Sequence, residues 1–171
     1  MTSRPNRHLV LFTVRDDAEG LAVHFITGPG RFSQQTQAAT AQAIAHAARA
    51  LGVSADSWSV GLSVVDPGVI LEGDSLSAMV SLTVAAMAKG ESIPRSRIIT
   101  GTVTRDGRIG PVGGVALKVK AARQTGLQMV LVPSIVGKRE RIPGLTQVFP
   151  VGSVSQAYKA LTASPSRLGN S

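Results

Sequence analysis

Ser77 and Lys118 are the two residues of this 171-residue chain that could together perform nucleophilic chemistry. Ser77 stands at the start of a strongly apolar run. A first helical turn there would offer unpaired backbone N–H groups and the positive end of a helix dipole to an oxyanion. A serine hydroxyl attacks a carbonyl only when another group takes its proton. A lysine accepts that proton when burial keeps its amine uncharged near neutral pH.

Both residues also have ordinary structural interpretations. A serine near a helix N-terminus commonly serves as a cap. Lys118 shares the apolar stripe of its expected helix with residues at helical spacing, namely Val115, Val119 and Ala122. Lys120 falls on a different, polar face of that helix. A lysine on an apolar stripe either extends its amine to water or keeps it in a dry pocket, where its pKa falls. Periodicity alone leaves both interpretations open.

The composition excludes several other chemistries. The chain has no cysteine, so disulfides, thiolate metal sites and cysteine nucleophiles are ruled out. The three histidines, His8, His24 and His46, are scattered without the spacing of metal ligands, so we expect no metal or other cofactor. The formal net charge of +8 suits a surface for nucleic acid, anionic lipid or an acidic partner. With 4% aromatic residues, however, base stacking has few candidates, and a solvated basic face is favoured.

Apolar periodicity and turn residues predict an α/β order of elements. Strands are expected at Leu9–Val14, Leu21–Thr27, Trp58–Val65, Ile98–Thr104, Met129–Pro133 and Val148–Val151. Helices are expected at Gln35–Leu51, Ser77–Lys89, Val115–Thr125 and Ser153–Thr162. Asp74 or Ser75 is expected to cap the second helix, which is apolar on nearly every side and should be buried. Asp106-Gly107 indicates a hairpin.

Several segments resemble the proteolytic domain of Lon-type serine peptidases, among them Gly28-Pro29-Gly30-Arg31 and the run from Gly126 to Pro133. Asp74-Ser75-Leu76-Ser77-Ala78 resembles the family segment Asp-Gly-Pro-Ser-Ala-Gly. Thr100-Gly101-Thr102-Val103 resembles Thr-Gly-Glu-Ile. The run from Arg108 to Gly114, with Lys118 and Ala121-Ala122 after it, resembles Val-Leu-Pro-Ile-Gly-Gly, Lys, Ala-Ala. The similarity covers nearly the whole chain and is strongest from Gly73 to Pro133. It implies a Lon-like α+β domain over residues 1–163, with mixed sheets packed against helices, followed by a flexible tail at 164–171.

The resemblance implies a role for each matched residue. Ser77 falls on the family's nucleophile, Lys118 on its general base, and Thr100 on the threonine that helps to position the lysine. Asp74 falls on an acidic residue of the nucleophile loop. Together with Leu76, Thr100 and Asp74 are the residues expected to support the dyad or the oxyanion. The implied activity is a serine endopeptidase, with backbone N–H groups around Ser77 holding the oxyanion.

The resemblance also implies partners and an assembly state. Family members commonly form six-membered rings, so a homo-oligomer acting on unfolded proteins or peptides is expected. They usually carry an ATP-driven unfolding domain, but this chain has no Gly-x-x-x-x-Gly-Lys-[Ser/Thr] phosphate loop. We therefore expect hydrolysis without ATP, with any unfolding supplied by a separate partner.

The chain departs from the family segments near the nucleophile. Ser75 and Leu76 replace a glycine and a proline, Met79 replaces the glycine after Ser-Ala, and Thr102 replaces a glutamate. These changes concern substrate access and oxyanion geometry more than the dyad itself.

Two non-enzymatic alternatives remain open at this point. One is a catalytically silent Lon-like scaffold that binds DNA or partner proteins through its basic face. The other is an assembly module that keeps a dyad but does not expose it. No apolar stretch is long enough to span a bilayer, and the run Leu9–Val14 is too short for a signal peptide. A cytoplasmic protein without membrane contact is therefore expected.

Overall fold

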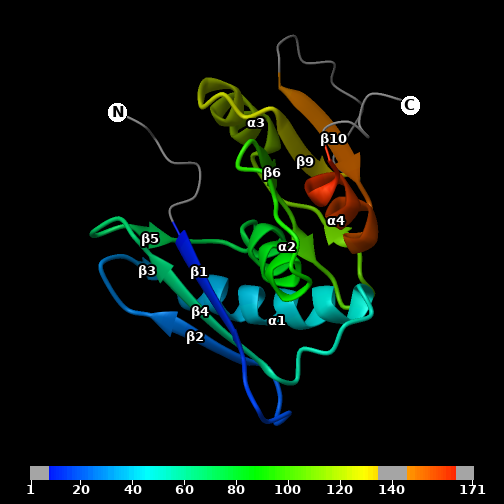
Figure 1. Ribbon diagram of the computed structural model, residues 1–171. Coiled ribbons are helices and arrows are strands. Elements are labelled where there is room, and N and C mark those ends of the chain that lie inside the picture. The colour runs from blue at the N-terminus through cyan, green and yellow to red at the C-terminus, as the bar shows by residue number, and fades with distance from the viewer. Residues whose placement is uncertain (1–7, 135–145, 165–171) are drawn as a thin grey trace.

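The computed structural model describes residues 8–134 and 146–164 (Figure 1). It is a mixed α/β structure with four helices in these ranges: α1 (Gln34–Ala50), α2 (Ser77–Ala88), α3 (Val115–Gln124) and α4 (Val154–Thr162). Each helix ends within one residue of its expected position. The expected tail lies outside the described residues, apart from Ser164.

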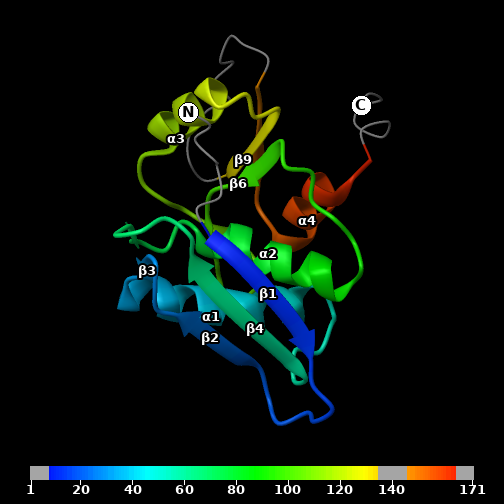
Figure 2. The same cartoon turned by 60° about the vertical axis from the view of Figure 1, so that its left-hand side comes forward.

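The first sheet has three strands, β1 (His8–Val14), β4 (Trp58–Val64) and β2 (Ala22–Ile26), in the order β1-β4-β2. β1 is antiparallel to β4, whereas β2 is parallel to it. Although β1 and β2 follow each other in the chain, they do not pair, because β4 lies between them. Alternate residues of β4 are buried, and these pack against α1 and α2, which lie on one face of the sheet (Figure 2).

The second three-stranded sheet is parallel, with the order β10-β9-β6. Its strands are β6 (Arg97–Ile99), β9 (Met129–Pro133) and β10 (Gln147–Val151). Every residue of β9 is buried: Met129 and Leu131 pack in the cluster with α2 and α4, whereas Val130 and Val132 pack with α3. A parallel sheet covered on both faces is the usual arrangement for such strands.

Helix α2 lies between the two halves of the molecule (Figures 1 and 2). Val80 and Val84 contact the cluster under the first sheet, while Ala78, Leu82 and Ala85 contact the cluster beside the second. The helix is thus buried on both sides, which confirms the expectation drawn from its lack of a polar face. This burial fixes the position of its first residue, Ser77.

The single strand expected at Ile98–Thr104 is divided in the structure. β6 ends at Ile99, and β7 (Thr102–Val103) instead pairs with β8 (Ile109–Gly110) across the expected hairpin. Thr100 and Gly101 lie between the two strands. A Cβ atom on Gly101 would come within 2.8 Å of Ile109 Cγ2, so only glycine fits this corner without a shift. Two short strands that were not expected, β3 (Arg31–Phe32) and β5 (Ile70–Leu71), pair in parallel before the nucleophile loop.

No helix in residues 8–134 and 146–164 has both the length and the apolar character needed to cross a membrane.

Candidate active site

The loop at residues 72–76, which we call the nucleophile loop, leads from β5 to Ser77. Its start is tied to α1 by Thr36, whose side chain is fully buried. Thr36 Oγ1 donates to the backbone carbonyls of Gly73, at 2.7 Å, and Leu71, at 3.2 Å. Ser33 caps the same helix by accepting from the Thr36 N–H at 3.2 Å. The sequence interpretation missed Thr36, although Ser33 and Thr36 have the spacing of a helix cap.

The end of the nucleophile loop is tied to the corner between β6 and β7. The Gly101 N–H donates to the Ser75 carbonyl at 3.1 Å, and the Ala78 N–H donates to the Gly101 carbonyl at 3.1 Å. The Thr100 N–H in turn donates to the Leu131 carbonyl of β9 at 3.0 Å. The segment that resembles the family's Thr-Gly-Glu-Ile therefore fixes the approach to Ser77 through its backbone.

Ser77 is the first residue of α2, and only 1% of its surface is exposed. The expected side-chain cap from Asp74 or Ser75 is wrong. The residue at the cap position is Leu76, in a helical conformation and without a side-chain hydrogen bond. Instead, the Ser77 N–H donates to the backbone carbonyl of Asp74 at 3.0 Å. The short turn closed by this bond brings the loop backbone onto the helix end and leaves no place for a side-chain acceptor.

The same hydrogen bonds correct the expectation of free N–H groups around Ser77. The Ser77 and Ala78 N–H groups both donate to carbonyls, so neither is free for an oxyanion in this conformation. Over the described residues, the Met79 N–H has no backbone acceptor. An oxyanion held by the Ser77 N–H would first have to displace the Asp74 carbonyl.

Lys118 lies on the half-buried side of α3. Its neighbours on the stripe, Val119 and Ala122, are buried, whereas Lys120 is exposed, which confirms the predicted division of the helix faces. Gly114, at the cap position just before the helix, has φ +66°, a conformation that favours glycine. Burial lowers the pKa of the Lys118 amine below its ordinary value, and the Asp74 carboxylate raises it in part. Desolvation is the larger of the two effects, so the uncharged amine is favoured relative to a lysine in water.

One cavity of about 270 Å³ brings several expected residues together. We call it the lysine cavity; Lys118, Thr100 and Leu76 all line it. Asp74 is near enough to raise the pKa of Lys118. Ser77 follows Leu76 in the chain but does not itself line the cavity. In the described ranges, neither Ser77 Oγ nor Thr100 Oγ1 makes a hydrogen bond to Lys118 Nζ. Catalytic hydrogen bonds are often long in a resting enzyme and shorten when substrate binds.

Replacing Thr36 by valine should slow turnover. The change removes the hydroxyl that holds Gly73 and Leu71 but keeps the side-chain shape. We expect the free energy of unfolding to fall by about 1 kcal/mol, because the half-buried Gly73 carbonyl loses its donor, whereas the Leu71 carbonyl keeps the Ser33 N–H at 2.9 Å. We also expect kcat to fall by up to about 10²-fold through a displaced Ser77. Thermal unfolding and steady-state kinetics measure the two effects, and Thr36→Ser should restore both. Unchanged kcat in Thr36→Val would contradict this positioning role.

Replacing Asp74 by asparagine should shift the pH dependence of the reaction. The Asp74 carboxylate favours the protonated form of Lys118, so its removal lowers the pKa of the amine. A base must be uncharged, hence the rising limb of kcat/KM against pH should move to lower pH. Asp74→Glu, which keeps the charge, is the control. A limb that stays in place or moves to higher pH in Asp74→Asn would contradict the electrostatic coupling.

The described residues contain no group of three or more His, Asp or Glu side chains that could hold a metal ion. The Ser-Lys dyad expected from the resemblance would require none, because its proton acceptor would be a side-chain amine.

Comparison with known proteins identifies the family of the chain. Residues 31–156, most of the chain, match the model of the Lon protease (S16) C-terminal proteolytic domain. The chain therefore belongs to the Lon protease proteolytic-domain family.

Curated relatives carry the same family name. An archaeal Lon protease of Archaeoglobus fulgidus is 38% identical over 63 residues, which cover 37% of this chain and 10% of the relative. A Lon protease of Mycolicibacterium smegmatis is 31% identical over 128 residues, covering 72% of this chain and 16% of the relative. An archaeal Lon protease of Thermoplasma volcanium is 32% identical over 103 residues, which cover 57% of this chain and 16% of the relative. The matched segments thus span 16% or less of these relatives' length.

Proposed function

We propose that this Lon-family chain hydrolyses peptide bonds of unfolded proteins or peptides with Ser77 as nucleophile and Lys118 as general base, without ATP. The observation that carries the proposal is the depressed pKa of Lys118 on a cavity that also contacts the residue before Ser77. Family membership, shown for residues 31–156, supports a serine peptidase. A homo-oligomer, as a ring of six copies, and a separate unfolding partner belong to the same proposal.

The chemistry proceeds through an acyl intermediate. Ser77 Oγ bonds to the substrate carbonyl carbon while its proton passes to Lys118 Nζ. The carbon–nitrogen bond then breaks, and the Lys118 ammonium gives its proton to the leaving nitrogen. Water attacks the resulting ester, again losing a proton to Lys118, which returns it to Ser77 Oγ. The atoms and charges balance, and no cofactor enters the cycle.

Oxyanion stabilisation in this scheme requires a change in the first turn of α2. The Ser77 N–H must leave the Asp74 carbonyl before it can donate to the substrate oxygen. Substrate binding in the lysine cavity contacts Ser75 and Leu76, which form the end of that loop. Thus the substrate itself contacts the segment whose movement would free the donor.

The burial of Ser77 favours one alternative, an assembly module whose dyad stays closed. The DNA-binding scaffold has less support from the described residues. Arg97 is buried and donates to the carbonyls of Ala160, Leu161 and Ala163 at the end of α4, at 3.2, 3.1 and 2.5 Å. That arginine serves the fold and is not part of a surface for phosphates.

The test combines substrate cleavage with active-site labelling. The purified chain is incubated with casein, an unfolded substrate, without nucleotide, and separately with a fluorophosphonate that reacts with activated serines. We expect casein fragments and a single label on Ser77 by mass spectrometry. The absence of both casein fragments and a labelled Ser77 would overturn the peptidase proposal. A salt-dependent shift of duplex DNA together with that result would favour the scaffold, whereas an oligomer without a DNA shift would favour the closed module.

A further inference from the structure

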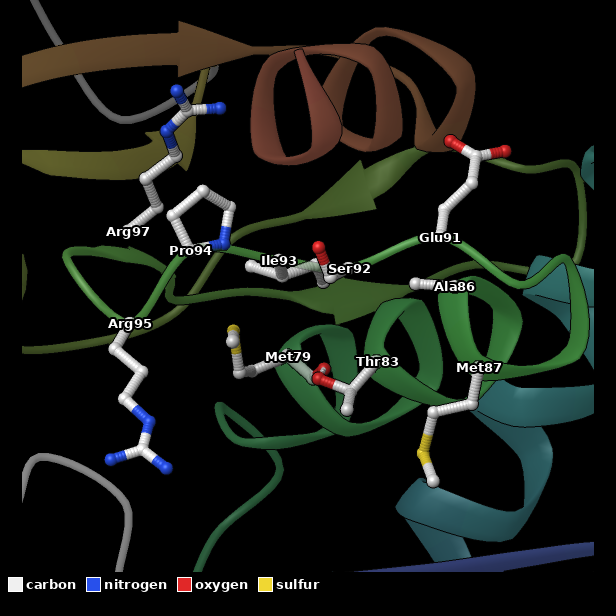
Figure 3. A pocket seen from close by; sticks show the side chains of 10 residues that line it. All are labelled: Met79, Thr83, Ala86, Met87, Glu91, Ser92, Ile93, Pro94, Arg95 and Arg97. Atoms are coloured by element: carbon white, nitrogen blue, oxygen red, sulfur yellow. Dashed lines mark hydrogen bonds between the residues drawn. The ribbon is translucent and has the colours of Figure 1, made fainter. Parts of the chain in front are cut away.

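Met79 is the one residue shared by the linings of two cavities in the described part of the chain. The first is the lysine cavity, of about 270 Å³. The second, of about 260 Å³, lies under the segment 91–97 and is lined by Met87, Ile93 and Pro94, among others. Figure 3 shows the Met79 side chain rising from α2 toward Ile93 and Pro94. Met79 is 5% exposed and lines both cavities.

The lysine cavity has the size and chemistry of a pocket for a single side chain. Its volume is below the roughly 300–1,000 Å³ typical of small-molecule sites. Most of its lining is apolar, contributed by Leu76, Met79, Ile98, Ile99, Ala121, Ala122, Leu127 and Val130. Lys118 and Thr100 are among the polar residues of the same lining. A peptide that presents its carbonyl to Ser77 would therefore place a neighbouring apolar side chain here.

We propose that Met79 determines which substrate side chains this pocket accepts, by closing it against the second cavity; this inference rests on the proposed peptidase function. Met79 follows Ser77 by two residues, so the wall and the nucleophile belong to one helical turn. Pro94 and Ile93 lie on the far side of this wall. Shortening Met79 would join the two volumes and allow a longer side chain, while the chemistry at Ser77 and Lys118 would be unchanged.

Two substitutions should alter the pocket in opposite directions. Met79→Val shortens the wall and should favour large side chains. Ala121, an exposed residue of α3, also lines the pocket. Ala121→Leu puts a larger side chain into the pocket, reduces its volume and should favour small substrate side chains. Met87→Ala is the matched control, because Met87 is also a methionine of α2 but borders only the second cavity. Met79→Leu keeps an apolar wall of similar volume and should behave like the parent.

The experiment measures kcat/KM for peptides that differ only in one residue beside the scissile bond. The series carries Val, Leu, Phe or Trp, first on the amino side of that bond and then on the carboxyl side. We expect Met79→Val to raise the ratio of Trp to Leu cleavage about 10-fold or more, the effect of a methylene-sized change in an apolar pocket. Ala121→Leu should lower the ratio of Phe to Val cleavage, and Met87→Ala should match the parent.

The possible outcomes separate this inference from the proposed function. Parent-like ratios in both Met79→Val and Ala121→Leu, with hydrolysis retained, would overturn the role of Met79 and leave the peptidase function standing. Absence of hydrolysis by the parent itself would overturn the proposed function and this inference together. Circular dichroism and thermal unfolding accompany each variant. If Met79→Val does not fold, Ala121→Leu decides the matter, because parent-like selectivity in that variant excludes the cavity as a substrate pocket and the role of Met79 with it.

Discussion

Ser77→Ala should reduce kcat/KM for an unfolded protein substrate by roughly 10³-fold or more, to the background of the assay. The substitution removes Ser77 Oγ, the proposed nucleophile at the first residue of α2, so no acyl intermediate can form. The buried side chain loses one oxygen and gains no volume, and Ser77 Oγ has no hydrogen bond to another described residue. We therefore expect thermal unfolding close to that of the parent.

Ser81→Ala is the matched control for Ser77→Ala. Ser81 is equally buried, lies one turn further along α2 and donates to the Ala78 carbonyl at 3.0 Å. Loss of the Ser81 hydroxyl should lower the free energy of unfolding slightly without removing peptidase activity. Parent-like cleavage by Ser77→Ala, or the same loss of activity in Ser81→Ala at full folding, would show that Ser77 is not the nucleophile.

Lys118→Met should reduce kcat/KM to a similar background level. Methionine retains most of the apolar length of the side chain but cannot accept a proton. Lys118→Arg should be as inactive, because a guanidinium stays protonated over the whole pH range of a peptidase assay. The double variant with Ser77→Ala should be no worse than either single variant, since the two residues act as one unit.

Lys120→Met provides the control for Lys118→Met, because Lys120 is the exposed lysine on the same helix. It should retain parent-like kcat/KM at moderate ionic strength. Substantial activity in Lys118→Arg would contradict a base at this position. Equal losses in Lys118→Met and Lys120→Met would instead indicate a general effect of the positive charge of α3.

Elements fixed by local pattern could be predicted from the sequence. The apolar run from Ser77 to Ala88 predicted a buried helix, and the stripe through Lys118 and Val119 predicted which face of α3 turns inward. Both are confirmed because periodicity and burial are properties of a single element. The hairpin at Asp106-Gly107 is confirmed for the same reason, since Gly107 takes φ +78° between β7 and β8.

Features set by contacts between distant segments could not be predicted. The strand expected at Ile98–Thr104 is divided because Gly101 bonds to the nucleophile loop, some 25 residues away in the chain. The first N–H of α2 donates to the Asp74 backbone carbonyl, which no side-chain preference could indicate. Thr36 acts on a loop that follows two further strands. In each case the deciding hydrogen bond joins groups whose proximity only the folded chain provides.

The candidate site was predicted as a set of residue types, but its present geometry was not. Lys118, Thr100 and Leu76, three of the residues expected at the site, line one cavity. The first-turn N–H groups at Ser77 and Ala78 are occupied, and the nucleophile is almost fully buried. A sequence can indicate which groups are available for catalysis. Whether the five-residue nucleophile loop exposes or buries these groups depends on small free-energy differences between alternative sets of backbone hydrogen bonds.

Direct titration of the Lys118 amine is the measurement that bears most closely on the account. Lysine side chains labelled with ¹³C are followed by NMR across pH, and Lys118→Arg identifies the signal by its disappearance. The account predicts a pKa below the ordinary value of 10.5, lowered further in Asp74→Asn. An amine that titrates at or above 10.5 in the substrate-bound protein would be protonated when the hydroxyl needs a base, and would contradict the Ser77–Lys118 mechanism.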